Sequence, residues 1–243
     1  MDTVVFEGYT GISLGDEPLI YDLFLLVIIV LLSCFALVFR ACYSLFVQMI
    51  RGVVTIKERR NLFDNPTQET FFFDMFMRFQ TLLLCAFVFF QVFCRIAALP
   101  RQNVRQTLIL LAVFFIILFM FYLLKRFLYY IYGRTFTETV KFSLWNTTWH
   151  TLFYLWGILL YFPVLWLMFD RERFVGALIV FVFTYILFRI LVIYVLIRIF
   201  YHKNAGLLYL SLYLCAQEIV PLLFLYKSLT YLHNVIEASI LWQ

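Results

Sequence analysis

The sequence has little glycine and little charge. Only 8 of its 243 residues are glycine, whereas roughly 17 would be expected at an average usage of about 7%. Charged residues make up 14% of the chain, and 65% of it is hydrophobic. So few polar residues cannot cover the surface of a soluble domain, which excludes a soluble globular protein. The mean hydropathy of +0.96 agrees, and the sequence predicts an integral membrane protein.

The scarcity of glycine also bears on how the helices pack. Transporters with close helix crossings and broken spans generally place small residues at their interfaces. This chain has 31 Phe, 16 Tyr and 5 Trp instead. We therefore expect helices that pack through large aromatic side chains, which disfavours a transporter without excluding one.

Cysteine and histidine are too few, and too widely spaced, to indicate a metal or cofactor site. The 5 cysteines show no CxxC spacing, and we expect them to be small apolar core residues. The 3 histidines form neither HxxxH nor HExxH, so the sequence predicts no metal, haem or other cofactor. No Ser/His, Glu/His or Asp/Asp arrangement indicates an enzyme, and we expect no catalytic activity. The net charge of +5 lies mostly in loops beside apolar runs, so nucleic acid is not an expected partner.

Six apolar runs predict an all-α, polytopic membrane protein. Residues 1–243 form a single membrane domain in this interpretation, with no soluble domain. About 20 helical residues span roughly 30 Å of hydrocarbon. The predicted helices cover residues 20–39, 71–98, 107–124, 150–169, 174–197 and 206–232. Residues 40–50 and 135–149 are either interfacial amphipathic segments or extensions of these helices.

Short local motifs predict where some helices begin and end. Residues 65–68 combine a capping asparagine, a proline and a capping-box glutamine, which indicates a helix start. Gly133 is a candidate C-terminal stop. Trp145 and Trp149 precede the fourth predicted span, and we expect their indoles at the level of the lipid headgroups.

The basic residues predict the orientation in the membrane. With the N-terminus outside, eleven Lys and Arg fall on the inner side and five on the outer side. The inner set is Arg40, Arg51, Lys57, Arg59, Arg60, Lys125, Arg126, Arg134, Lys141, Arg198 and Lys203, and the outer set is Arg95, Arg101, Arg105, Arg171 and Arg173. The first twenty residues contain four acidic and no basic residues, so we expect no cleaved signal peptide. Both termini are therefore predicted outside the cytoplasm.

Two ionisable residues lie deep in predicted spans. Glu218 lies roughly 18 Å along the sixth predicted helix, and Arg189 lies 13 to 14 Å up the fifth from the same side. A charge at a helix centre costs about 2.5 to 3.5 kcal/mol and needs a partner, water or a function. We expect an interhelical Arg189–Glu218 pair that is either structural or part of a proton relay or polar substrate contact. A third alternative is a protonated, hydrogen-bonded Glu218.

Other polar residues in the spans are easier to explain. Pro221 shares a helical face with Glu218 and frees a backbone carbonyl, which can make a kink. Lys227 is predicted on the opposite face near the outer leaflet, where it snorkels. Asp74 and Arg78 are four residues apart on one helix face, so we expect an interfacial ion pair.

The C-terminal part of the sequence carries a resemblance to a known family. The stretch LYLSLYLCAQEIVPLLFLYKSL, residues 208–229, with YHK at residues 201–203, resembles an uncharacterised family of multi-pass inner-membrane proteins of Bacteroidota, a domain of unknown function. The resemblance implies location in the bacterial inner membrane, with periplasmic termini. It also makes Glu218, Pro221 and Lys227 the matching positions of most interest.

These observations predict a non-catalytic inner-membrane protein that serves as a subunit or scaffold of a cell-envelope complex. The expected partners are the lipid bilayer and either another membrane protein or a second copy of the chain. The alternatives are a small transporter or proton-coupled channel that uses Arg189 and Glu218, and a lipid-active membrane enzyme.

Overall fold

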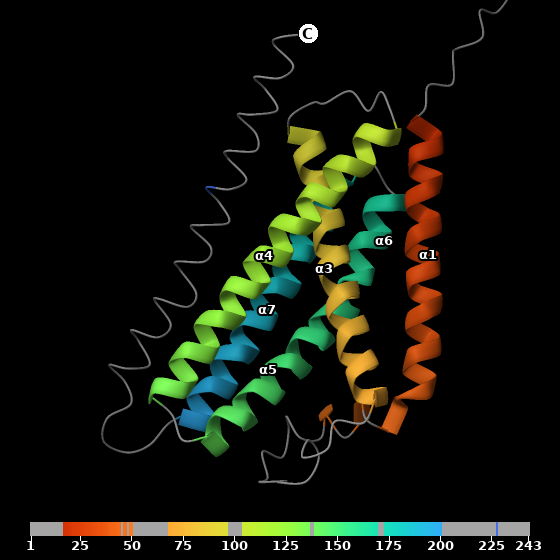
Figure 1. Ribbon diagram of the computed structural model, residues 1–243. Coiled ribbons are helices and arrows are strands. Elements are labelled where there is room, and N and C mark those ends of the chain that lie inside the picture. Colours follow the sequence, from red (N-terminus) through yellow and green to blue (C-terminus); the bar gives the residue numbers. More distant parts are fainter. Residues whose placement is uncertain are drawn as a thin grey trace, which may run out of the picture.

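The computed structural model describes residues 17–44, 46–47, 49–50, 68–96, 104–136, 139–169, 173–200 and 227. All regular elements within these ranges are helices, which confirms the all-α prediction. The helices are α1 (Glu17–Ala41), α3 (Gln68–Ile96), α4 (Val104–Phe136), α5 (Thr139–Leu159), α6 (Tyr161–Phe169) and α7 (Phe174–Phe200) (Figure 1).

Among the described residues, five spans are long and apolar enough to cross a bilayer. They are Asp22–Ala41, Phe71–Arg95, Val104–Ile131, Trp145–Phe169 and Phe174–Val195. The chain is therefore a multi-pass α-helical membrane protein. The predicted sixth span, residues 206–232, lies outside the described residues apart from Lys227.

The spans run alternately up and down, and two of them form the centre of the bundle. α3 and the α5–α6 pair lie between α1 on one side and α4 and α7 on the other (Figure 1). The Phe71–Arg95 and Trp145–Phe169 spans are each 61% buried, against 17% to 22% for the spans of α1, α4 and α7. The C-terminal ends of α1, α4 and α7 and the N-terminal ends of α3 and α5 gather at one end of the bundle (Figure 1). We call this the basic end, because Arg40, Arg126 and Arg198 lie toward it.

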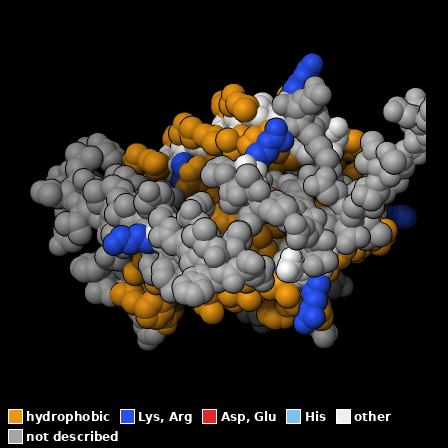
Figure 2. Space-filling model, turned by 90° about the horizontal axis from the view of Figure 1, so that it is seen from above, with side chains coloured by type: hydrophobic (Ala, Val, Ile, Leu, Met, Phe, Trp, Pro, Cys, Tyr) orange, Lys and Arg blue, Asp and Glu red, His pale blue; other side chains and the backbone are white. Residues whose placement is uncertain are grey.

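The outer helices expose large apolar side chains along much of their length. Examples are Leu37 on α1, Phe127 on α4 and Ile179 on α7. In the view along the bundle, hydrophobic side chains lie around the rim, and the visible basic side chains are scattered among them (Figure 2). Such surfaces are compatible with acyl chains and not with water.

The fourth span is divided into two helices at Leu160, which the sequence analysis had read as one. Pro163 has no N–H to donate to the carbonyl of Leu159, and its ring crowds that carbonyl. Hydrogen bonds from Leu160 N to Trp156 O (3.0 Å) and from Val164 N to Leu160 O (3.2 Å) carry the helical path across the junction. Pro163 thus separates α5 from α6 while the span continues.

Other helix ends also differ from the predicted ones. α4 continues through Gly133 to Phe136, because a single glycine costs a helix only about 1 kcal/mol and does not end it. α5 begins at Thr139, so its first turns extend the fourth span. The described residues 43–50 are helical, and Phe46 N donates to Cys42 O at 3.1 Å. That segment therefore follows α1 after a turn at Cys42.

The two tryptophans at the start of the fourth span lie inside the protein. Trp145 and Trp149 are both buried. The Tyr129 ring packs against both indoles, at centroid distances of 6.0 Å and 5.6 Å. Packing against α4 thus decides that both indoles point inward, while their depth at the level of the headgroups stays a prediction.

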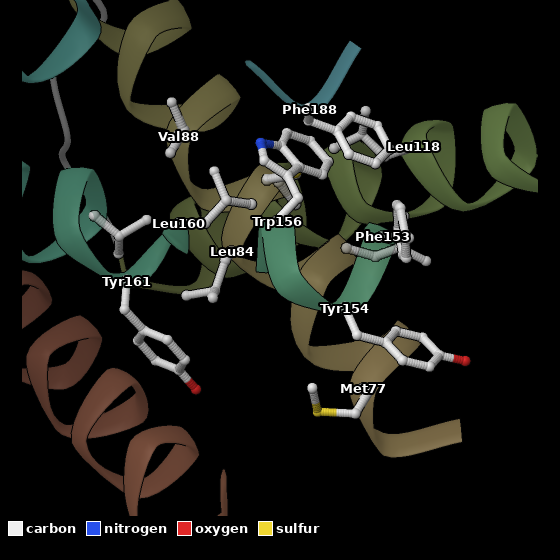
Figure 3. Packing of buried hydrophobic residues seen from close by; sticks show 14 of the residues in the cluster. Met77, Leu84, Val88, Leu118, Phe153, Tyr154, Trp156, Leu160, Tyr161 and Phe188 are labelled. Carbon is white, nitrogen blue, oxygen red and sulfur yellow. The ribbon is translucent and has the colours of Figure 1, made fainter. Parts of the chain in front are cut away.

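The core is rich in aromatic side chains, as the composition indicated. Trp156 stacks on Phe188 at 5.1 Å, and Phe24 of α1 packs against Phe87 and Phe90 of α3 at 5.3 Å and 5.6 Å. Leu84, Val88 and Leu160 fill the space between α3 and the α5–α6 junction (Figure 3). Cys42, Cys85 and Cys94 are buried and Cys34 is partly buried, which agrees with their expected role as core residues.

Candidate functional site: a buried polar cluster at the basic end

Arg189 lies within α7 and is held by a tyrosine one turn earlier. Its Nε and Nη2 donate to the Tyr185 hydroxyl at 2.8 Å and 2.6 Å. The Tyr185 ring in turn packs edge-on against Trp156 at 5.9 Å. The guanidinium is thus anchored on the inner side of α7, against α5.

The other residues predicted around Arg189 are mostly not described. Glu218 and Pro221 lie outside the described residues, so the expected Arg189–Glu218 pair stays a prediction. Lys227 is described and is exposed.

Asp74 and Arg78 form an ion pair on α3. Arg78 Nη2 contacts Asp74 Oδ2, as their i, i+4 spacing allows. Both side chains are only partly exposed, at 31% for Asp74 and 22% for Arg78. The pair therefore does not lie on an open aqueous surface, and it belongs to a larger group of residues.

That larger group comes from three helices and is called the polar cluster below. It consists of Asp74 and Arg78 of α3, Tyr122 and Arg126 of α4, and His150 of α5. Arg126 acts electrostatically on all four other members, and Arg78 acts on Tyr122 and His150. α3 and α4 are antiparallel. The order of Asp74 and Arg78 along the bundle is therefore the reverse of the order of Tyr122 and Arg126. Arg126 therefore lies level with Asp74, and Tyr122 with Arg78.

Aromatic rings enclose the cluster on the α4 and α5 sides. Tyr122 packs against Trp149 and Phe153 at 5.9 Å and 5.4 Å. His150 packs edge-on against Trp149 at 5.2 Å and stacks on Tyr154 at 6.1 Å. These rings hold the imidazole and the phenol in place and exclude water from their sides.

Several polar atoms here are buried and have no hydrogen-bond partner in the part of the chain that the structure describes. They include both ring nitrogens of His150, Nε of Arg78 and the hydroxyl of Tyr154. The fully buried Gln80, on the same stretch of α3, has both its amide nitrogen and its amide oxygen in this state. Buried polar groups are normally paired, so unpaired ones indicate a missing partner such as water or a ligand.

An apolar layer separates the cluster from the opposite end of the bundle. Leu84 and Val88 of α3 lie with Leu160 and Trp156 of the central span, and Phe188 closes the layer from α7 (Figure 3). The polar cluster therefore lies on the side of this layer that faces the basic end.

α3 and α5 approach each other very closely next to the cluster. A Cβ placed on Gly157 would lie 2.0 Å from Oγ1 of Thr81. The Thr81 hydroxyl donates to the Met77 carbonyl at 2.8 Å, which fixes its rotamer. One of the few glycines of this chain thus permits the central helix crossing.

The cluster carries more positive than negative side chains. Two guanidinium groups face one carboxylate, and the phenol and the imidazole add hydrogen-bonding capacity. Among the described residues, no three His, Cys, Asp or Glu side chains lie together as metal ligands.

Sequence reasoning found Asp74 and Arg78 but not the other three members. From the sequence, Arg126 was counted only among the basic residues of the inner side, and His150 was the first residue of the fourth predicted helix. One available signal was the i, i+4 pair Tyr122 and Arg126. Arg126 lies five residues before the end of its span, and Asp74 lies three residues after the start of its own, so both pairs lie near the same end of the bundle. That these two pairs lie next to each other became clear only from the packing of α3 against α4.

The fold and the cluster together define a polytopic α-helical membrane protein with ionisable groups inside the bundle. A family model for a domain of unknown function, DUF4271, matches residues 24–229. The chain belongs to that family, which confirms the resemblance to an uncharacterised family. No curated protein and no solved structure matches the chain.

Proposed function

We propose that the protein is a non-catalytic subunit or scaffold of a membrane-embedded complex. We place it in the cell envelope of a bacterium, in the inner membrane, with both termini in the periplasm. The observation that carries this proposal is an aromatic patch on α3 and α4.

The aromatic patch consists of Phe79, Phe115 and Phe119. Phe79 is 47% exposed although it belongs to α3, one of the two central spans. Its ring packs edge-on against Phe115 at 5.4 Å, and Phe115 stacks on Phe119 at 6.3 Å. Ile116 and Met120, both exposed, flank the patch. Aromatic side chains and methionine are enriched at protein interfaces, where rigid rings bury a large area at small entropic cost.

The apolar layer across the bundle favours a subunit over an open channel. A channel needs polar groups that ions or protons can reach from both sides. In the described bundle, Leu84, Val88, Trp156, Leu160 and Phe188 are buried together and supply apolar surface at this level, which supports the preference for a subunit.

A second candidate function is a small transporter or a proton-coupled channel. The position of Arg189 inside α7 favours it, because ionisable groups at such depth often mark substrate or proton routes. This candidate requires the apolar layer to open during the cycle and Glu218 to lie on the route.

The test is a pull-down of the tagged protein from its native membrane in mild detergent. The Phe79→Ala/Phe119→Ala variant removes the aromatic patch, and Ile179→Ala/Ile186→Ala on the exposed face of α7 is the matched control. We expect a stoichiometric partner with the wild type and the control, and its loss with the aromatic variant. A second copy carrying a different tag distinguishes a homo-oligomer from a separate protein. Purification of the wild type alone would contradict the subunit proposal and direct attention to proton-flux assays in vesicles.

A further inference from the structure

We infer that the polar cluster of Asp74, Arg78, Tyr122, Arg126 and His150 binds a phosphate-bearing anion. The phosphate belongs either to an anionic lipid headgroup or to free phosphate. This inference goes beyond the subunit role, and its test measures ligand affinity instead of co-purification.

The first argument is the charge balance. The cluster holds two arginines and one carboxylate, so one positive charge has no opposite charge within it. Asp74 is already in contact with Arg78. An uncompensated charge in a low-dielectric surrounding is costly, and a bound anion offsets that cost.

The second argument is the set of buried donors that have no partner in the described bundle. His150 is only 6% exposed, and neither ring nitrogen has a hydrogen-bond partner there. Arg78 uses Nη2 on Asp74, which leaves its buried Nε available. This Nε–H is a charged donor that suits a phosphate oxygen. A neutral imidazole contributes one further N–H donor.

The third argument concerns which groups surround the imidazole. The His150 imidazole interacts electrostatically with Arg78 of α3 and Arg126 of α4, while Trp149 and Tyr154 cover it from its own helix. Among the described residues, the charged groups that act on it are thus two cations, and Asp74 contacts one of them, Arg78. This surrounding suits an anion and opposes a metal cation.

The fourth argument is depth. Asp74 lies three residues inside the apolar span of α3, and Arg126 and His150 lie five residues inside theirs. At 1.5 Å per residue these distances are roughly 5 to 8 Å. Arginine side chains reach that far toward the interface, which brings the guanidinium groups to the level of lipid phosphates.

The fifth argument is access. Arg126 is exposed on α4, and the side chains around it on that face, Leu123, Phe127 and Tyr130, are also exposed. A charged group within an apolar, outward-facing surface is reached from the bilayer. A lipid can place its phosphate on Arg126 while its acyl chains lie along α4.

The experiment uses the purified full-length chain in dodecylmaltoside micelles and follows its thermal unfolding. The probes are dioleoylphosphatidylglycerol, dioleoylphosphatidylcholine and inorganic phosphate. Phosphatidylcholine has the same acyl chains and a phosphate, but its choline cation cancels the negative charge. A ligand that binds the folded state raises the unfolding midpoint in a concentration-dependent manner, and this gives an apparent dissociation constant.

We expect phosphatidylglycerol, and not phosphatidylcholine, to raise the midpoint of the wild type. Arg126→Gln weakens this binding by about tenfold or more, because it removes a charge-assisted contact. The matched control is Arg105→Gln, which removes an exposed arginine from the opposite end of the same helix and leaves the affinity within about twofold. If inorganic phosphate raises the midpoint and phosphatidylglycerol does not, the site is retained and its ligand is free phosphate.

Two results would overturn the inference. One is the absence of any shift with either anionic probe. The other is equal weakening by Arg126→Gln and Arg105→Gln, which would show only general surface electrostatics. If Arg126→Gln does not fold, Arg126→Lys replaces it. That variant keeps the charge but loses the fork, so it still weakens binding, whereas Arg105→Lys does not.

Discussion

Gly157 of α5 and Thr81 of α3 meet so closely that a single added methyl group has no space. A Cβ on Gly157 would lie 2.0 Å from Thr81 Oγ1 and 3.0 Å from Thr81 Cβ. Thr81 cannot move aside cheaply, since its hydroxyl is bonded to the Met77 carbonyl and its side chain is fully buried. The two central spans therefore depend on this glycine for their spacing.

Gly157→Ala is expected to destabilise the protein by about 1–3 kcal/mol, because overpacking pushes α3 and α5 apart. The measurement is the free energy of unfolding, obtained by titrating a denaturing detergent into micelles of a mild one. Gly176→Ala is the matched control, since its Cβ would meet the Trp166 ring at ordinary distances of 3.6 Å to Cζ2 and 4.0 Å to Cη2. Thr81→Ala in the Gly157→Ala background removes the 2.0 Å contact and should restore part of the loss. Equal stability of both glycine variants would show that the crossing is looser than the structure has it.

Trp156 is expected to be the most sensitive aromatic residue of the α5–α7 contact. It stacks on Phe188 at 5.1 Å with an interplanar angle of 15° and packs against Tyr185. Trp156→Ala should lower the free energy of unfolding by about 3 kcal/mol. This is the low end for aromatic truncations, because lipid solvates apolar surface and only packing is lost. Trp156→Phe should cost much less, since it keeps the ring stack and removes an indole N–H that has no partner among the described residues. A Trp156→Phe variant as unstable as Trp156→Ala would assign the effect to the N–H instead.

The proposed pair of Arg189 and Glu218 can be tested by a double-mutant cycle. If the two side chains interact, Arg189→Gln and Glu218→Gln each lower the unfolding midpoint, and the double variant loses less than the sum. The expected coupling is about 0.5–3 kcal/mol. Tyr185→Phe tests the contact that the structure shows and should cost about 1 kcal/mol, because it removes the acceptor for Arg189 Nε and Nη2. Additive effects of the two Gln variants would contradict the pair.

The predicted orientation can be tested with reporter fusions. An enzyme reporter active only in the periplasm should report activity when fused after residues 101 and 243, and none after residue 137. This pattern follows from the excess of basic residues on the inner side and from a sixth span within residues 206–232. A cytoplasmic C-terminus with a periplasmic N-terminus would show that the chain has an odd number of spans.

Part of the fold could be predicted because it depends on local properties. α3 is described from Gln68, the last residue of the predicted capping motif, while residues 65–67 lie outside the described residues. The number and approximate position of the five described spans follow from apolar length alone. The Asp74–Arg78 contact follows from i, i+4 spacing on one helix.

Other features could not be predicted because they depend on which helices meet. A soluble helix shows its buried side through an alternation of apolar and polar residues, but a membrane helix is apolar on the lipid side as well. The sequence therefore did not distinguish the exposed Phe127 from the buried Phe114 on α4, or show that Trp145 and Trp149 point inward. The break at Leu160 could not be predicted either, because it depends on how Pro163 and the residues around the α5–α6 junction pack against α3.

The sequence by itself determined that this chain is a helical, multi-pass membrane protein, because its long apolar segments and few charged residues are compatible with a lipid bilayer and not with water. The tertiary structure decided that α3 and α5–α6 form the centre and that Arg126, Tyr122 and His150 join Asp74 and Arg78. The physical reason is that a polar cluster between antiparallel helices requires residues far apart in the chain to reach the same depth. Only the register of α3, α4 and α5 against one another sets that depth.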